Sequence, residues 1–285
     1  MIIINIIYCC HFVSILLQYV KFFKLVANMF FQKGSLDDSI KSVKHTYVHG
    51  IEEPVHSHQV VQLLHIISGV IRVYTDTNCW VIPPSRGLWI PAGTPHSLIA
   101  VGTVEIRTLF IEPLARADLT NVCGIFQVGS LLRELIIAAS EFKEEVARGS
   151  REERIQELIL DELRLLHFTD FNVPMPKDKI LLNFCNRVSD RLDHPWELPD
   201  AAQLLSVSEK TISRKFHSET GLSFGEWLRR FRILKSMELL ASGYTVLDTA
   251  IAVGYDSHSS FSTMFKKRVG ISPNNFVANK VESTV

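Results

Sequence analysis

The sequence predicts an α+β protein, in which an N-terminal antiparallel β-barrel is joined to an all-α C-terminal domain with two helix-turn-helix motifs. Two observations predict this fold class. From about His45 to Pro113, short β-rich runs alternate with turns that contain Gly and Pro, which is typical of an antiparallel sandwich or small barrel. From about Pro199 to Phe276, one helical pattern occurs twice, and the second copy is shifted by 49 residues.

The composition is that of an ordinary globular protein. The chain has 285 residues, 47% hydrophobic and 21% charged, which is long enough for two domains. Its net charge is zero, but 14 Lys and Arg face 10 Asp and Glu between Lys179 and Lys280. This positive excess fits nucleic-acid binding, and a chance asymmetry explains it about as well.

The cysteines bear on the cellular compartment. There are five of them, an odd number without the spacing of a disulfide framework, so we expect reduced thiols in a cytoplasmic protein. They are Cys9, Cys10, Cys79, Cys123 and Cys185.

Residues 1–44 form an apolar N-terminal extension that we leave out of the predicted fold. A secretory signal peptide is disfavoured because no basic residue precedes the apolar run. Ile2 to Val20 is nearly long enough to span a membrane as a helix. Alternatively, translation starts at Met29 and the preceding residues belong to an over-extended start. Both alternatives stay open.

Histidines gather in the β-rich region. His56 and His58 point to the same face of a strand because side chains alternate with a period of two. Gln62 shares that face if no bulge intervenes, and His96 approaches from a neighbouring strand. Three imidazoles and an amide oxygen suit a divalent metal such as Zn²⁺, Ni²⁺, Fe²⁺ or Mn²⁺. The alternative is that these side chains line a ligand pocket or are satisfied residues of the barrel.

These residues resemble the two sequence motifs of the cupin family, whose small barrels hold a metal with two His, an acidic residue and a third His. The resemblance covers about Pro54 to Pro113 and implies a cupin-like, effector-sensing barrel at residues 45–115. It departs at Gln62, where enzymatic cupins usually have Glu. Because the loss of that anion weakens metal binding and disfavours catalysis, a metal-dependent cupin oxygenase or isomerase with a helical appendage is only the alternative function.

Residues 116–176 are predicted to be a helical linker. Residues 129–139 and 151–168 each place apolar side chains on one stripe of a helix. Such stripes pack on the barrel, on each other or on a second subunit, so a homodimer contact is one of the alternatives. Two prolines within Phe171–Lys177 then predict a semi-rigid interdomain segment.

Residues 177–285 form the predicted C-terminal domain, whose two motifs have the same frame. Each copy has a Ser at the helix N-cap, apolar residues four apart, and a Gly that ends the helix. Ser208 and Gly221 bound the first of these helices, and Ser257 and Gly270 bound the second. Between the copies, one long helix is expected.

The outward faces of the two capped helices are polar. An outward helix of this kind can enter the major groove of DNA and contact base edges. Arg214 is the best candidate for a bidentate contact with guanine, worth about 1–3 kcal/mol of discrimination. The alternative is a solvated face of a helical bundle. The predicted DNA-binding residues are Glu209, Lys210, Ser213 and Arg214 in the first copy, and His258, Ser259, Ser262 and Thr263 in the second.

The long helix from about Phe224 to Leu240 has an apolar side and three arginines. Such a rod would hold the two outward helices at a spacing near the roughly 34 Å repeat of the major groove. Arg229, Arg230 and Arg232 are therefore expected to reach phosphates.

The C-terminal region closely resembles the DNA-binding domain of the AraC/XylS family of bacterial transcription regulators. Residues Gly254–Phe265, Gly270–Pro273 and Phe276 match the family pattern, and the resemblance covers Lys179–Phe276. It implies a non-enzymatic activator or repressor that binds double-stranded promoter DNA and has RNA polymerase as a partner. It also implies that the barrel senses a small-molecule or metal effector and often dimerises. Because the second residue set lacks Arg and Lys, we expect its helix to position the protein on DNA more than to specify the base sequence.

Overall fold

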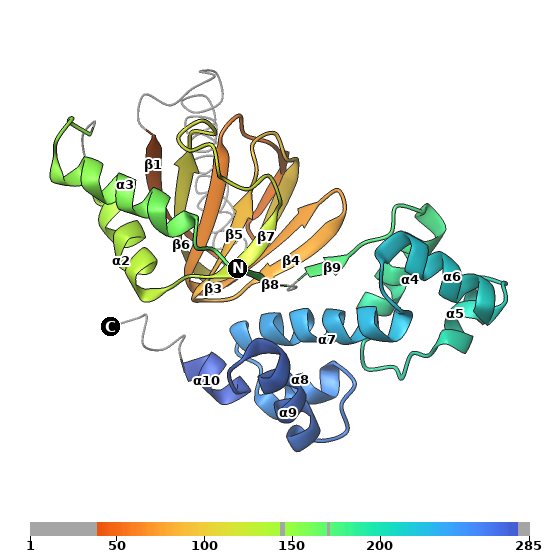
Figure 1. Ribbon diagram of the computed structural model, residues 1–285. Helices are drawn as coiled ribbons and strands as arrows, with labels where there is room; N and C mark the ends of the chain where they lie inside the picture. The colour runs from red at the N-terminus through yellow and green to blue at the C-terminus, as the bar shows by residue number, and fades with distance from the viewer. Residues whose placement is uncertain (1–38, 143–145, 170–171, 279–285) are drawn as a thin grey trace, which may run out of the picture.

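The computed structural model describes residues 39–142, 146–169 and 172–278 of the chain. In these ranges an antiparallel sheet lies against a helical domain (Figure 1). The predicted α+β class, with an antiparallel sheet domain followed by an all-α domain, is thereby confirmed. No helix of the described ranges is long and apolar enough to cross a membrane. The apolar segment Ile2–Val20, the alternative start at Met29, and Cys9 and Cys10 lie outside them.

Nine strands form one sheet, and its path runs β1-β6-β3-β5-β7-β8. β2 pairs with β6, and β4 pairs with β3 and β9. In the described residues this sheet is curled but is not closed into a barrel, because its path does not return to its first strand. The strands are β1 (Ile40–Tyr47), β2 (Glu52–His56), β3 (Val61–Thr75), β4 (Asn78–Ile82), β5 (Arg86–Ile90), β6 (His96–Ile111), β7 (Gly124–Gln127), β8 (Phe168–Thr169) and β9 (Asn172–Pro174).

The curl comes from bends in the two long strands. The sequence predicts a turn at Ser68–Gly69, but β3 runs through it with a register shift at Ser68 against β6. Gly69 has φ +76°, and a Cβ there would overlap the Thr103 carbonyl oxygen, so the bend requires glycine. Beyond the bend, β3 curves back, and residues from both halves face one apolar core, including Leu64 and Val73.

Two helices cover the outer face of the sheet. They are α2 (Ser130–Ala139) and α3 (Arg151–Leu163). Their apolar stripes join Leu63 and Leu109 of the sheet in a second core, through Ile136 and Ile159 among others. The predicted stripes therefore pack within the monomer.

The proline-containing segment between the domains is more than a linker. Asn172–Pro174 forms β9, which pairs with β4. The indole Nε1 of Trp227 donates a hydrogen bond of 2.9 Å to the Pro174 carbonyl oxygen. Proline is tolerated here because β9 is an edge strand, where a missing N–H costs no ladder hydrogen bond. The segment thus attaches the sheet to the helical domain.

The helical domain has the predicted caps. Asp178 accepts a hydrogen bond from the Leu181 amide at 2.9 Å and begins the first helix. Gly221 and Gly270 end their helices in the left-handed conformation, with φ +71° and +92°. The helices are α4 (Lys179–Asp190), α5 (Leu198–Leu204), α6 (Glu209–Thr220), α7 (Phe224–Ala241), α8 (Val246–Ala252), α9 (His258–Val269) and α10 (Pro273–Ala278).

The two helix-turn-helix motifs, α5–α6 and α8–α9, lie toward opposite ends of α7 (Figure 1). Phe216 and Phe265 occupy matching positions in the two copies, and both are fully buried. Both belong to a core that also contains Trp227 of α7. The long helix therefore holds both motifs in one packed unit.

The sheet and the helical domain share part of their core. Val70 and Val81 of the sheet are buried among the apolar side chains of the helical domain. Beside them, Arg72 forms a bidentate ion pair with Glu238 of α7, with one bond of 2.5 Å from Nε to Oε1. Because the Glu238 side chain is only 5% exposed, breaking this pair would leave a buried charge with only the 3.5 Å contact to Lys235.

Candidate DNA-binding helices and histidine pocket

α6 presents a polar face to solvent. The Ser208 hydroxyl accepts a hydrogen bond from the Thr211 amide at 3.2 Å, which fixes the start of the helix. Ile212 and Phe216 point into the core. The four residues predicted from this copy are all exposed: Glu209, Lys210, Ser213 and Arg214.

α9 has the same frame with different exposed residues. Its N-cap Ser257 accepts from the Ser260 amide at 3.2 Å, and Phe261 and Phe265 are buried. His258, Ser259 and Thr263 are exposed and Ser262 is half-buried. Cations appear only in the last turn of α9, in the run Lys266-Lys267-Arg268. The run is evident in the sequence, and the structure adds that it lies at the C-terminus of the helix. The helix dipole favours positive charges at that end.

The 49-residue shift pairs the two faces position by position. Lys210 corresponds to Ser259, and Arg214 corresponds to Thr263. In the described residues neither Lys210 nor Arg214 forms an ion pair, so both head groups are available to an anion such as DNA. The first copy can therefore form charged contacts with base edges or phosphates that the second copy cannot form at the same positions.

The arginines of α7 have partners within the chain, and their contact with phosphates stays a prediction. Arg232 donates to the carbonyl oxygens of Leu192 and His194, each at 3.1 Å. Arg230 donates to the Asn172 carbonyl oxygen at 3.5 Å. The Leu192 and His194 carbonyl groups follow the end of α4 and need a donor, which Arg232 supplies, whereas the Asn172 carbonyl is on β9. Arg229 is exposed but pairs with the nearby Glu226.

The three histidines predicted to share a site lie together. Ring nitrogens of His56, His58 and His96 all lie within 4.8 Å of one another. His56 on β2 is paired directly with His96 on β6. Nδ1 of His56 contacts the Pro54 carbonyl oxygen at 2.8 Å, and Nδ1 of His96 contacts that of Thr94 at 2.9 Å. Because a carbonyl only accepts, each Nδ1 carries a proton, which makes Nε2 the atom that a neutral ring offers to a metal.

We call His56, His58 and His96 the histidine pocket. Burial keeps the His58 and His96 rings of this pocket neutral. Burial, together with the neighbouring His56 and His96, lowers the pKa of His58 to about 3. Burial likewise lowers the pKa of His96 to about 4. Neutral imidazole is the form that binds a metal ion. Gln62 is buried beside His58, but the two lie on different elements, because His58 follows the end of β2 and Gln62 is on β3.

A carboxylate that the sequence pattern does not reveal lies beside these rings. The Glu53 Oε2 atom is 3.9 Å from Nε2 of His56, and the Tyr47 hydroxyl donates to Glu53 Oε1 at 2.5 Å. Burial raises the pKa of the Glu53 carboxyl, while the Tyr47 bond and His56 lower it. On a straight strand Glu53 and His56 would point to opposite faces. A register irregularity between them brings them to one side.

The donors fit a borderline divalent cation. Three imidazoles, an amide and a nearby carboxylate are the ligand types that Zn²⁺, Ni²⁺, Fe²⁺ and Mn²⁺ accept. Gln62 stands where the cupin motif has a carboxylate, and the Glu53 carboxylate on β2 lies 3.9 Å from His56 instead. The same groups can also hold a small polar molecule through hydrogen bonds.

An antiparallel domain with a buried polar pocket, packed on a pair of helix-turn-helix motifs, defines a ligand-responsive DNA-binding regulator. Residues 44–166 match the AraC-like ligand binding domain family, and residues 201–279 match a helix-turn-helix domain family. The two matches together cover more than half of the chain. The chain belongs to the AraC family of transcription regulators, as a DNA-binding protein with an N-terminal ligand-binding domain.

Known proteins resemble the chain to different extents. The HTH-type transcriptional regulator NimR of Escherichia coli (strain K12) is 28% identical over 228 residues, which are 80% of this chain and 83% of NimR. The putative HTH-type transcriptional regulator YkgA of the same strain is 31% identical over 103 residues, 36% of this chain and 43% of YkgA. The solved structure of ToxT from Vibrio cholerae is 14% identical with a TM-score of 0.36, covering 85% and 99% of the two chains.

Proposed function

We propose that this regulator reads its operator mainly through α6, and that a ligand in the histidine pocket controls the reading. The observation that carries the proposal is the repeated frame with unequal faces. Both recognition helices have the same caps and buried phenylalanines, but only α6 presents Lys210 and Arg214 at the positions compared. α9 then positions the protein, with Ser259 and Thr263 as weaker contacts.

The spacing of the motifs supports binding to one face of DNA. α7 has 18 residues, which corresponds to a length of about 27 Å at 1.5 Å per residue. Two recognition helices at its ends approach the roughly 34 Å repeat of the major groove. One molecule can thus place both helices in successive grooves of double-stranded DNA.

The effector is a divalent metal ion or a small molecule held by His56, His58, Gln62 and His96. Support comes from the lone pairs of the imidazoles, which converge in a largely buried site. Glu53 adds the negative charge that a metal would need, or an acceptor for a ligand hydroxyl. In this function the pocket binds and does not catalyse.

Two protein partners complete the proposal. Leu131 on α2 and Leu158 on α3 are exposed apolar residues, which supports a homodimer contact through these helices. RNA polymerase is the expected partner at the promoter, and the cytoplasm is the expected compartment.

A salt-dependent mobility-shift assay on the promoter region next to the gene tests DNA reading. The wild-type protein is expected to bind specifically, with an affinity that falls steeply as salt rises. Arg214→Ala should bind about tenfold or more weakly, because a bidentate guanine contact is worth about 1–3 kcal/mol. An Arg214→Ala protein that bound the operator as well as wild type would remove the recognition role of α6.

The effector role is tested at the histidines. In the double variant His56→Ala/His58→Ala, both the metal content after equilibrium dialysis and the response of DNA binding to the ligand should drop. If metal content and response were unchanged, the pocket would not be the sensing site. Glu53→Gln provides a milder variant, expected to weaken a metal more than a neutral ligand.

One observation favours the alternative of a metal-dependent oxygenase or isomerase. Glu53 restores a carboxylate beside the histidines, which such an enzyme needs for metal binding or proton transfer. Turnover of candidate small substrates by the metal-loaded protein, lost in Glu53→Gln, would establish an enzyme. Metal or ligand binding that changes DNA affinity without turnover would support the regulator.

A further inference from the structure

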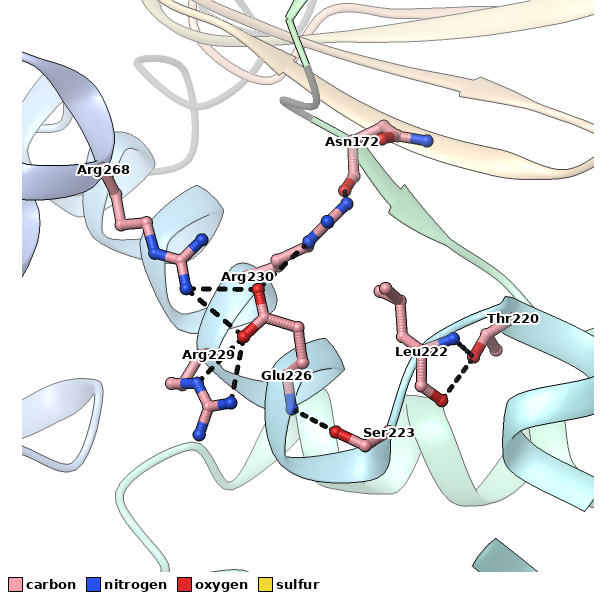
Figure 2. A network of polar contacts seen from close by, with 8 residues as sticks. All are labelled: Asn172, Thr220, Leu222, Ser223, Glu226, Arg229, Arg230 and Arg268. Atoms are coloured by element: carbon pink, nitrogen blue, oxygen red, sulfur yellow. Dashed lines mark hydrogen bonds and ion pairs between the residues drawn. The ribbon is translucent and has the colours of Figure 1, made fainter. Parts of the chain in front are cut away.

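A glutamate at the start of α7 connects the two helix-turn-helix motifs. Glu226 lies in the first turn of α7, and its backbone amide donates a hydrogen bond of 3.3 Å to the hydroxyl of the N-cap Ser223. Figure 2 shows its side chain pointing away from this cap, toward arginines of two helices. The side chain is 22% exposed, so the carboxylate is partly withdrawn from solvent.

Three arginines contact the Glu226 carboxylate (Figure 2). Arg229 donates to Oε2 from Nε at 3.1 Å and from Nη2 at 3.0 Å, and Arg230 donates to Oε1 at 3.4 Å. Nη2 of Arg268 on α9 lies 3.2 Å from Oε1 and donates to Oε2 at 3.3 Å. Burial raises the pKa of Glu226, but the Arg229 hydrogen bond and the charge of Arg268 bring it below the ordinary value, so the group is ionised at neutral pH.

The contact with Arg268 joins the last turn of α9 to the first turn of α7, across 42 residues of sequence. α9 packs against α8 and α10, and its buried Phe265 and Val269 belong to the core that contains Trp227 of α7. Apolar packing is not directional, whereas a contact between a guanidinium group and a carboxylate has a defined geometry. The Glu226–Arg268 pair therefore fixes where the end of α9 lies along α7.

The end of α6 lies at the same place. Thr220 is the last residue of α6, and its hydroxyl donates to the Phe216 carbonyl oxygen at 2.8 Å and accepts from the Leu222 amide at 3.2 Å. These bonds make the three-residue connection from α6 to α7 compact. The ends of both recognition helices are thus tied to the start of α7, the end of α6 through this connection and the end of α9 through Glu226.

We propose that Glu226 is a positioning residue, which sets the distance and angle between α6 and α9 and thereby the half-site spacing that the protein accepts. The inference rests on the proposed function, in which both helices enter successive major grooves of one operator. An inserted base pair moves the second half-site by about 3.4 Å along the DNA and rotates it by about 34°. A protein in which Glu226 holds α9 resists that change, and a protein without the carboxylate follows it more easily.

The ratio of the affinities for two duplexes measures this role. The first duplex is the segment that the wild-type protein protects in the promoter region next to the gene, and the second has one base pair inserted between the half-sites. Fluorescence anisotropy at fixed salt gives each dissociation constant. The wild-type protein should bind the second duplex about tenfold or more weakly than the first, and Glu226→Gln about threefold or less. The general effect of the lost charge acts on both duplexes alike and cancels in the ratio.

Further variants separate positioning from charge and from folding. Arg268→Gln removes the α9 side of the contact and should lower the ratio as Glu226→Gln does. The double variant should have the ratio of either single variant, because all three lose the same interaction. Asp193→Asn is the matched control, which removes an acid that pairs with the nearby Arg191 at 3.5 Å and should keep the wild-type ratio. Thermal unfolding shows which variants are folded, and Arg268→Gln carries the test if Glu226→Gln is not.

The inference is overturned if folded Glu226→Gln and Arg268→Gln proteins keep the wild-type ratio, or if Asp193→Asn lowers it as much as they do. Equal affinity of the wild-type protein for both duplexes also overturns the inference, while the proposed function stands because the operator is bound. A wild-type protein that binds neither duplex specifically contradicts the proposed function, and this inference with it.

Discussion

In the first helix-turn-helix, the exposed face of α6 carries Lys210 and Arg214, whereas α9 has Ser259 and Thr263 at the matching positions of the second. Beneath these faces the two copies are built alike. Both helices start at a Ser cap, end at a left-handed Gly and bury two apolar side chains four residues apart. Because the caps and the buried residues maintain the repeated fold, the exposed residues of the two copies can differ.

The copies also differ in what holds them. The second copy lies near the sheet, where Arg86 donates to the carbonyl oxygen of Val269 and where Phe276 of α10 borders a small cavity with Val70. The first is held from the interdomain segment, where the Glu219 carboxylate accepts from the amide of Lys177 at 3.0 Å. The second copy thus contacts strands of the sheet domain, whereas the first contacts the segment that follows β9.

The prediction with the largest expected effect tests whether the two helix-turn-helix motifs are packed alike. Phe216→Ala and Phe265→Ala should each lower the free energy of unfolding by about 3–5 kcal/mol, because each removes a fully buried ring from one shared core. Chemical denaturation measures both. A loss in only one of the variants would mean that the two frames are not equivalent in packing.

The second prediction tests the difference in attachment. Arg72→Ala should cost about 3 kcal/mol, because Glu238 would remain buried without its bidentate partner. Glu238 lies in the half of α7 next to α8, so amide hydrogen exchange should rise more in α8–α9 than in α5–α6. The double variant Arg72→Met/Glu238→Leu should regain part of the stability. An equal rise of amide hydrogen exchange in both copies would contradict a specific attachment of the second copy to the sheet through Arg72 and Glu238.

A reciprocal exchange of side chains tests the difference in chemistry. Arg214→Thr should weaken operator binding by about 1–3 kcal/mol, whereas Thr263→Arg should not weaken it. Fluorescence anisotropy at fixed salt measures both affinities. If Arg214→Thr left the affinity unchanged while Thr263→Arg abolished binding, the assignment of the two copies would be reversed.

Low pH should destabilise the sheet domain and should affect the two helix-turn-helix copies equally. The pKa of His58 and of His96 is lower in the folded chain than the ordinary value of about 6.5, so the unfolded chain binds more protons below that pH. The free energy of unfolding should therefore fall as pH falls from about 6.5 toward 4, by at most about 1.4 kcal/mol per pH unit for each ring. His56 and Glu53 face the same rings.

Denaturation at several pH values measures this loss, and the variant His58→Gln/His96→Gln provides the control. The control should show a flatter dependence on pH. A wild-type protein whose stability did not change between pH 6.5 and 5 would contradict the burial of neutral rings in the histidine pocket.

Local signals explain why the helical domain could be predicted from sequence. The caps at Ser208 and Ser257 and the stops at Gly221 and Gly270 act within one helical turn, so the residue types alone indicate them. The pairing of β2 with β6 places His56 beside His96, whereas His58 follows the end of β2, so strand alternation does not account for its place. The assignment of particular residues to DNA or effector contact stays a prediction.

Features that depend on bulges and on distant partners could not be predicted. Glu53 reaches the histidine pocket only because the register shifts between it and His56. Ser68–Gly69 has the composition of a turn, but the pairing of β3 with β6 on both sides keeps the strand continuous. Arg230 and Arg232 look like phosphate contacts in the sequence, and their carbonyl partners come from segments far along the chain.

The unequal roles of the two copies are tested most directly by an affinity scan of the operator, in which each base pair is substituted in turn. We expect substitutions in the half-site contacted by α6 to cost about 1–3 kcal/mol each, and those one helical turn away to cost less. The Arg214→Ala protein should lose discrimination at one position in the first half-site. Equal costs in both half-sites, or larger costs in the second, would contradict the account.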